Sequence, residues 1–185
     1  MNKKDFRVIK DFPKEGINFI DIMPILNDKD LFAECIKKLE NKLVSQFAYD
    51  DIDVIVGGEA RGFIFGAALA AQMGVRFVPI RKAGKLPGRV IKGAYSLEYG
   101  TDSLEIQSDS IKLGDKVVIV DDILATGGTV ECMINLVDTL GGEVKDCLFV
   151  ADLSDLPGVK RLNDWNVKFD SLFSFSDKYL TEVAK

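Results

Sequence analysis

The stretch VVIVDDILATGGTV, residues Val117 to Val130, decides the fold of this 185-residue chain. Its first four residues are all β-branched, which predicts a short buried strand over Val117–Val120. Asp121 and Asp122 follow at once, and two carboxylates at a strand end are costly to desolvate unless a charged or hydroxylated partner meets them. Ala125 to Thr129 then leads into a helix predicted over Thr129–Leu140. The stretch therefore reads as strand, loop and helix start.

The loop has the composition of an anion site. Gly127 and Gly128 allow a tight turn that exposes backbone N–H groups, and the helix N-terminus adds partial positive charge. Thr126 and Thr129 add hydroxyl donors, so a phosphate monoester fits without any lysine. An ordinary turn with Thr126 or Thr129 as helix N-cap is the alternative for TGGT alone, and the aspartate pair favours the phosphate site. The loop matches neither an ATP P-loop nor the GxGxxG of dinucleotide sites.

Short apolar runs alternate with helical patterns along the rest of the chain, which predicts an α/β fold with a central parallel sheet and helices on both faces. Ligands in such folds bind beyond the carboxyl ends of the strands. Residues 1–27 are expected to be irregular. The other predicted elements are a helix over Leu31–Phe47 capped by Asp28 or Asp30, a strand over Ile52–Val56, a helix over Phe63–Met73 ended by Gly74, strands over Phe77–Ile80 and Val144–Val150, and a hairpin over Tyr95–Ile106.

Composition narrows the class of protein. The chain is 47% hydrophobic with a net charge of −5, which fits one domain over residues 1–185 and gives no reason to expect a nucleic acid or an anionic membrane as partner. Neither a signal peptide nor an apolar run of about 18 residues is present, so we expect a cytoplasmic protein. The absence of histidine excludes catalytic triads and metal sites that use histidine. Cys35, Cys132 and Cys147 are expected to be buried free thiols.

A cationic segment runs from Arg61 to Leu97 without a single Asp or Glu. Random variation is one explanation, and a binding site for a polyanion such as pyrophosphate is the other. Two loops in or beside it follow predicted strands, GGEARG at Gly57–Gly62 and RKAGKLPG at Arg81–Gly88, and the second is expected to be exposed and mobile. The cations of the whole segment from Arg61 to Leu97 are Arg61, Arg76, Arg81, Lys82, Lys85, Arg89 and Lys92.

The run Val117–Val130 resembles the phosphoribosyl pyrophosphate (PRPP) motif of type I phosphoribosyltransferases. Four further blocks, in the same order along the chain, are similar to the adenine phosphoribosyltransferase family: FPKEGINFIDIMPIL (Phe12–Leu26), EARGFIFGAALA (Glu59–Ala70), FVPIRKAGKLPG (Phe77–Gly88) and YSLEYGTDSLEIQ (Tyr95–Gln107). The resemblance covers most of the chain and thins after about Leu162.

This resemblance implies a type I phosphoribosyltransferase fold with an inserted β-hairpin and flexible loop, and a small N-terminal hood over residues 1–27. It implies a pentosyltransferase of purine salvage that converts adenine and PRPP to AMP and pyrophosphate. It also implies a homodimer and Mg²⁺ bound mainly through PRPP, with no direct protein ligand assigned. A cis peptide before Ala60 is a further family feature.

The resemblance also implies roles for individual residues. Asp121 and Asp122 face the ribose, and Glu98 is a general acid at N7 of the purine with Tyr99 in the flexible loop. Phe19 and Leu153 would sandwich the base, with backbone atoms of Asn18 and Ile20 at its edge. The 5′-phosphate residues are Ala125, Thr126, Gly127, Gly128 and Thr129. The pyrophosphate residues are Glu59, Ala60, Arg61, Arg81, Lys82 and Lys85, of which Arg61 is also counted as catalytic.

Several alternatives stay open at this point. Ile20 stands where the family usually has Arg or Lys, which keeps a transferase for hypoxanthine or guanine in view. A PRPP-sensing regulator without catalysis is a second alternative. From the residue pattern alone, the alternation of Glu98 with Leu97 and Tyr99 favours an outward-facing side chain, and only the resemblance favours a catalytic role. The pattern fits Phe19 equally well as a core aromatic.

Overall fold

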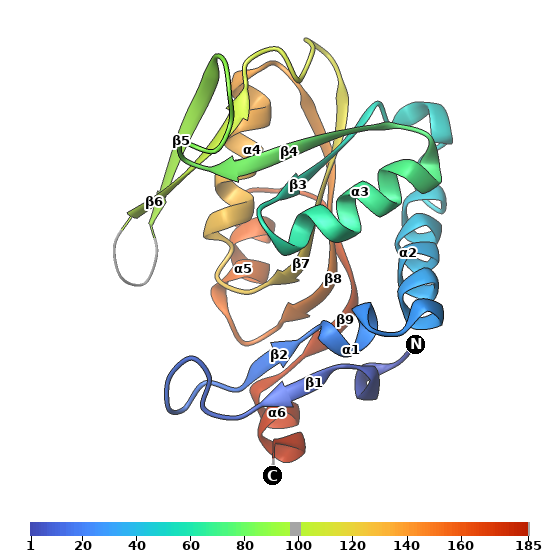
Figure 1. Ribbon diagram of the computed structural model, residues 1–185, viewed down its shortest axis with the longest axis vertical. Coiled ribbons are helices and arrows are strands. Elements are labelled where there is room, and N and C mark those ends of the chain that lie inside the picture. The colour runs from blue at the N-terminus through green and yellow to red at the C-terminus, as the bar shows by residue number, and fades with distance from the viewer. Residues whose placement is uncertain (97–100, 185) are drawn as a thin grey trace.

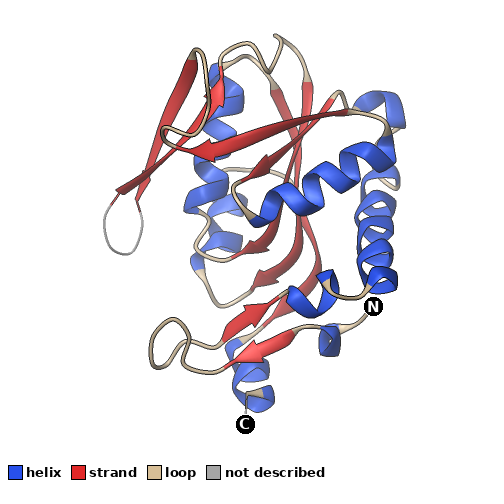
Figure 2. Cartoon of the chain, in the orientation of Figure 1, coloured by secondary structure: helices blue, strands red, loops and turns tan. Residues whose placement is uncertain are grey.

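A seven-stranded mixed sheet organises the chain. The computed structural model describes residues 1–96 and 101–184. The strands lie in the order β5-β6-β4-β3-β7-β8-β9, and helices cover both faces (Figures 1 and 2). The strands are β3 (Val54–Gly58), β4 (Arg76–Lys82), β5 (Val90–Ser96), β6 (Thr101–Gln107), β7 (Lys116–Leu124), β8 (Glu143–Leu153) and β9 (Phe169–Phe175).

Five adjacent strands, β4-β3-β7-β8-β9, are parallel, which confirms the predicted parallel sheet. A hairpin is present as predicted, because β5 and β6 pair antiparallel and β6 adds antiparallel to the end of β4. Its first strand, however, begins at Val90 rather than at the predicted Tyr95. The helices are α1 (Met23–Leu26), α2 (Lys29–Val44), α3 (Arg61–Met73), α4 (Gly128–Thr139), α5 (Pro157–Asp164) and α6 (Asp177–Val183).

Alternation along the central strands fills two hydrophobic layers. In β7, Val118 and Val120 pack on the side of α2 and α3, whereas Val117 and Ile119 pack on the side of α4. Successive side chains of a strand point to opposite faces, so a strand covered on both faces reads as an unbroken apolar run. This is why Val117–Val120 could be recognised as a buried strand.

Local signals set the helix ends. The Asp28 carboxylate accepts hydrogen bonds from the backbone N–H groups of Asp30 and Leu31, so Asp28 is the cap of α2. Gly74 ends α3 with φ +68°, a left-handed conformation that favours glycine. All three cysteines are buried and free, as predicted. Across the residues that the structure describes, no helix is long and apolar enough to cross a bilayer.

The N-terminal segment differs from the prediction. Residues 1–27 were expected to be irregular, yet β1 (Arg7–Ile9) and β2 (Phe19–Asp21) form an antiparallel ribbon followed by α1. Strands of three residues are too short to show periodicity in the sequence. Phe6 and Ile20 anchor this segment to the core shared by α2, α3 and β9.

Candidate active site

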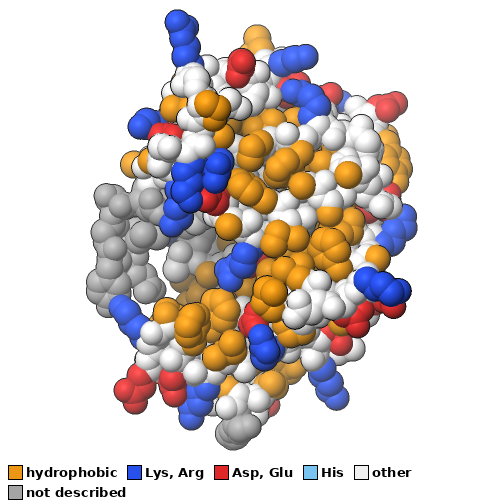
Figure 3. Space-filling model, viewed as in Figure 1, with side chains coloured by type: hydrophobic (Ala, Val, Ile, Leu, Met, Phe, Trp, Pro, Cys, Tyr) orange, Lys and Arg blue, Asp and Glu red, His pale blue; other side chains and the backbone are white. Residues whose placement is uncertain are grey.

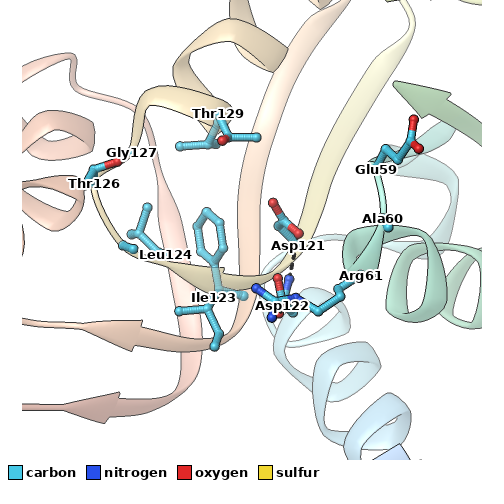
Figure 4. A pocket seen from close by; sticks show the side chains of 13 residues that line it. Glu59, Ala60, Arg61, Asp121, Asp122, Ile123, Leu124, Thr126, Gly127 and Thr129 are labelled. Carbon is cyan, nitrogen blue, oxygen red and sulfur yellow. Dashed lines mark hydrogen bonds and ion pairs between the residues drawn. The ribbon is translucent and has the colours of Figure 1, made fainter. Parts of the chain in front are cut away.

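A cavity of about 300 Å³ opens at the carboxyl ends of β3 and β7, where the topology places ligands of an open parallel sheet. Figure 4 shows Asp121 and Asp122 between the loop with Thr126 and Gly127 on one side and the start of α3 with Arg61 on the other. The lining residues are Glu59, Ala60, Arg61, Asp121, Asp122, Ile123, Leu124, Ala125, Thr126, Gly127, Thr129, Val130 and Phe149.

The acidic pair lies within β7 rather than after it. The strand was predicted to end at Val120, but the ladder continues to Leu124 because β8 is eleven residues long and pairs with β7 along this extension. Asp122 is almost fully buried, and its backbone N–H donates to Asp121 Oδ1 at 2.9 Å. The strand therefore holds the two carboxylates rigidly at the pocket.

Burial, and the neighbouring charge of Asp122, raise the pKa of Asp121 well above its usual value. The space beside this carboxylate exists because residue 62 is glycine, since a Cβ there would lie 2.7 Å from Asp121 Oδ1. Two neighbouring carboxylates are stabilised by hydroxyl donors or by a cation. The pair thus suits the two hydroxyls of a ribose.

Arg61 is the first residue of α3 and lies opposite the acidic pair. Its Nε is 2.6 Å from Asp122 Oδ2, and its guanidinium carbon is 5.6 Å from the centroid of the Phe19 ring. About half of the side chain is exposed. Arg61 therefore connects the pocket to the N-terminal segment, and it presents a cation to any anion that enters.

The loop that begins at Ala125 leads into α4. The N-cap of this helix is Gly127, with φ +85°, so no side chain caps the helix. The alternative with Thr126 or Thr129 as the cap is therefore wrong. The first N–H groups of a helix lack intrahelical acceptors. With Ala125, Thr126, Gly127 and Thr129 lining the cavity and Gly128 opening the helix, the loop is shaped to bind an anion.

Three residues predicted to bind pyrophosphate, Arg81, Lys82 and Lys85, contact Glu59 but are not among the residues that line the cavity. Lys85 Nζ lies 2.5 Å and Arg81 Nε 3.2 Å from the carboxylate of Glu59, and the backbone N–H of Lys82 donates to it at 3.1 Å. The hydrogen bond from Lys85, with those from Lys82 and Arg81, lowers the pKa of Glu59 to about 2. The peptide bond between Glu59 and Ala60 is cis, which confirms the family feature.

The acid-free segment does not converge on the pocket as a whole. Arg76 pairs with Asp115 at 2.6 Å, near the start of β4 and thus at the opposite end of the sheet. Lys92 pairs with the buried Glu105 at 2.8 Å, and neither cation lines the cavity. Carboxylates outside the segment therefore neutralise part of its charge, which the linear sequence does not reveal.

The residues predicted to bind the base lie outside the lining of this cavity. Phe19 packs edge-on against Phe12 at a centroid distance of 5.2 Å and faces Arg61. Ile20 is 2% exposed, so its side chain belongs to the core. Asn18 Nδ2 donates to Thr181 Oγ1 at 3.4 Å, and Leu153 ends β8. Glu98 and Tyr99 lie outside the described residues.

Four lining residues were absent from the predicted site: Ile123, Leu124, Val130 and Phe149. Phe149 falls within the predicted strand Val144–Val150, but the neighbour of β7 in the sheet cannot be read from a hydrophobic pattern. Gly62 was part of the GGEARG block, and its contact with Asp121 depends on α3 lying against β7. These residues become visible only when the strand order is known.

Comparison with known proteins agrees with this geometry. The family model described as phosphoribosyl transferase domain matches residues 25–174. The adenine phosphoribosyltransferase of Acetivibrio thermocellus is 51% identical over 166 residues, which is 90% of this chain and 95% of the relative.

Solved structures show the same likeness. The adenine phosphoribosyltransferase of Thermoanaerobacter pseudethanolicus has a TM-score of 0.87 at 47% identity and covers 94% of this chain and 97% of its own. The Saccharomyces cerevisiae enzyme, complexed with an imino-altritol bisphosphate and adenine, has a TM-score of 0.83 at 42% identity over 92% and 95% of the two chains.

The chain therefore belongs to the type I phosphoribosyltransferases, a class defined here by the parallel sheet, the acidic pair and the anion loop. Within that class it is a member of the adenine phosphoribosyltransferase family, the pentosyltransferases of purine salvage.

Proposed function

We propose that the chain transfers the 5-phosphoribosyl group of PRPP to N9 of adenine, giving AMP and pyrophosphate. One observation carries the proposal: a single cavity collects an anion loop, a carboxylate pair and a cation in the order phosphate, ribose and pyrophosphate would need. The similarity to adenine phosphoribosyltransferases over most of the chain supports adenine as the acceptor.

The residues divide the substrate between them. The loop Ala125–Thr129 binds the 5′-phosphate, and Asp121 with Asp122 accepts hydrogen bonds from the ribose hydroxyls. Pyrophosphate then lies toward Glu59, Ala60 and Arg61. Arg81, Lys82 and Lys85 stabilise the charge that develops on it. The C1–O bond to pyrophosphate breaks through an oxocarbenium-like state while N9 forms the new bond to C1. Glu98 is the proposed proton-transfer group at N7, and the family resemblance assigns Tyr99 to the flexible loop.

The carboxylate oxygens of Asp121 and Asp122 fit a nearby magnesium ion. Asp122 Oδ2 is buried without a hydrogen-bond partner, although Arg61 Nε is within ion-pair distance. Carboxylate, hydroxyl and phosphate oxygens are the ligands that Mg²⁺ prefers, and it usually binds through few protein groups together with substrate phosphates. When bound, Mg²⁺ neutralises charge on the leaving pyrophosphate. Asp121 and Asp122 would hold the ribose of PRPP beside that ion.

The base site is proposed from the N-terminal hood, residues 1–27. Phe19 and Leu153 stack on the two faces of adenine, and backbone atoms of Asn18 and Ile20 read its edge. The position of Phe19 beside Arg61 supports this assignment, because it puts an aromatic ring next to the ribose end of the cavity. We further propose that the hood and the sheet form one domain over residues 1–185, since Phe6 and Ile20 share the core of α2 and α3.

The exposed side of α3 supports a homodimer. Ile64 is 39% exposed, and Ala67 and Ala71 lie on the same side of the helix at positions i+3 and i+7. Figure 3 shows hydrophobic side chains gathered over α3 and β4 on this face. A helix that is apolar all round is normally buried. A second copy of the chain is the proposed partner, because it would cover an apolar face that begins beside Arg61.

The buried free thiols favour a reducing compartment such as the cytoplasm.

Pyrophosphate release tests the function. The protein is mixed with PRPP and Mg²⁺ and with adenine, hypoxanthine, guanine, xanthine or uracil in turn. Turnover with adenine is expected, and omission of Mg²⁺ should abolish it. Turnover with hypoxanthine or guanine but not adenine would overturn the proposed acceptor. PRPP binding without turnover of any base would instead favour a PRPP sensor.

A further inference from the structure

The N-terminal turn of α5 supports the phosphate loop from behind. The backbone N–H of Gly158 donates to the carbonyl of Ala125 at 2.9 Å. Gly158 is buried, while most residues of α5 are exposed. This hydrogen bond links two segments more than 30 residues apart in the chain. The loop is therefore held by α5 as well as by β7 and α4.

The two backbones are in direct contact. A Cβ on Gly158 would overlap the carbonyl oxygen of Ala125 and lie 2.9 Å from Leu124 Cδ1. From the other side, a Cβ on Gly127 would lie 3.0 Å from Gly158 Cα. Only residues without a side chain permit this approach, so the hydrogen bond depends on glycine at position 158.

An ion pair reinforces the same contact. Arg161, one turn further along α5, places its guanidinium 3.2 Å from the carboxylate of Glu131 in the first turn of α4. Its aliphatic stem lies against Gly127, because a Cβ there would meet Arg161 Cδ at 3.4 Å. Arg161 thus joins α5 to the helix start that the loop leads into.

The anchored carbonyl determines where the next N–H group points. In a trans peptide the C=O and N–H groups point in opposite directions. Since the Ala125 carbonyl is directed at α5, the N–H of Thr126 is directed away from α5, on the side where Ala125 and Thr126 line the cavity. The same anchor keeps a partially negative oxygen away from an incoming phosphate.

From these contacts we infer that Gly158 is a positioning residue for the 5′-phosphate: through Ala125 it aims the Thr126 N–H at the phosphate, and Arg161 secures the arrangement. The inference rests on the proposed function and adds α5 to the PRPP site. It predicts a defect confined to ligands that carry the 5′-phosphate.

The test is Gly158→Ala, with Gly142→Ala as control. Gly142 is also crowded, since a Cβ there would lie 2.8 Å from Val137 Cγ1, but its neighbours are side chains and it follows the opposite end of α4. For Gly158→Ala, the KM for PRPP should rise about tenfold or more, as expected when a charge-assisted hydrogen bond is misaligned. The KM for adenine should stay within about twofold. Affinity for ribose 5-phosphate should fall in calorimetry, while affinity for pyrophosphate should not. Gly142→Ala should lower only the thermal midpoint.

A second pair of variants keeps the test decisive if Gly158→Ala does not fold. Arg161→Ala should raise the KM for PRPP several-fold, whereas Lys160→Ala, an exposed neighbour paired with Asp164, should not. An unchanged KM for PRPP in folded Gly158→Ala, or in Arg161→Ala, would overturn the inference. Wild-type protein is assayed first. If it turns over no base, the proposed function fails, and ribose 5-phosphate binding by the same variants still decides the role of Gly158.

Discussion

Arg61 Nε lies 2.6 Å from Asp122 Oδ2, and this ion pair joins the first residue of α3 to the strand that carries the acidic pair. Arg76 and Asp115 form a pair of the same length, with a similarly exposed arginine and a similarly buried aspartate. The two ion pairs differ mainly in place, since one borders the cavity and the other lies near the start of β4. This gives the site a matched internal control.

Arg61→Ala should lower kcat/KM for PRPP by roughly 100-fold or more, because a preorganised cation at the leaving group is lost. Arg76→Ala removes a comparable ion pair and should change kcat/KM by less than about threefold. Steady-state kinetics and thermal unfolding of both variants check this. Equal losses of activity in the two variants would mean that Arg61 acts only through stability.

Glu98→Gln should lower kcat by roughly 100-fold or more while the KM for PRPP changes little, because proton transfer at the base is lost and phosphate binding is kept. Asp109→Asn is the control, since Asp109 is an exposed carboxylate shortly after β6. The measurement is kcat and the KM for PRPP at saturating adenine. An unchanged kcat would remove Glu98 from the mechanism.

Ile64→Lys should convert the proposed dimer to monomer, because it places a charge in the apolar stripe of α3. Leu113→Lys is the matched control, since Leu113 is an apolar side chain that is 90% exposed away from that helix. Light scattering after size exclusion gives the mass of each species. A monomeric wild-type protein, or a dimer that survives Ile64→Lys, would contradict the proposed interface.

Asp146→Asn should stabilise the protein at neutral pH. The Asp146 side chain is completely buried, and both carboxylate oxygens lack a hydrogen-bond partner. Burial raises its pKa from 3.8 to about 6, so between these values the folded state binds more protons than the unfolded state. The contribution of Asp146 to the free energy of unfolding therefore falls as pH rises from about 4 to about 6, and it stays low above pH 6.

The expected gain for Asp146→Asn is on the order of 1–3 kcal/mol at pH 8 and shrinks as pH falls toward about 4. Urea unfolding of wild type and variant across this range measures it. Asp138→Asn, an acidic residue of α4 that is not buried, should give a smaller change. A gain from Asp146→Asn that grows on acidification would refute the assignment.

Much of the sheet could be predicted because its strands are covered on both faces. Runs such as Val117–Val120 have no solvent side, so they stand out as unbroken apolar segments between helical patterns. The short ribbon of β1 and β2 was missed, because its stability comes from Phe6 and Ile20 packing on distant elements rather than from local periodicity. The end of β7 was misplaced for a similar reason, since β8 supplies the extra ladder.

The site was predictable where a function needs residues close together in the chain, as in Asp121–Thr129. The site was less predictable where a cation is neutralised by a carboxylate that is distant in the chain. Arg76 and Lys92 belong to the same acid-free segment as Arg61, yet Asp115 and Glu105 neutralise them at other positions. The role of Gly158 was also hidden, because its crowded contact with Ala125 exists only after α5 packs against the loop.

Helix α3 begins at the cavity with Arg61 and carries the apolar stripe on its exposed side. The helix is 13 residues long, so one rigid element about 20 Å in length connects the cavity to the proposed dimer interface. Catalytic competence should consequently depend on how concentrated the protein is. Diluted below the dissociation constant of the proposed dimer, the protein should lose specific activity, and PRPP should restore it if it binds the dimer more tightly than the monomer. An assay at nanomolar protein would then report on assembly as much as on turnover.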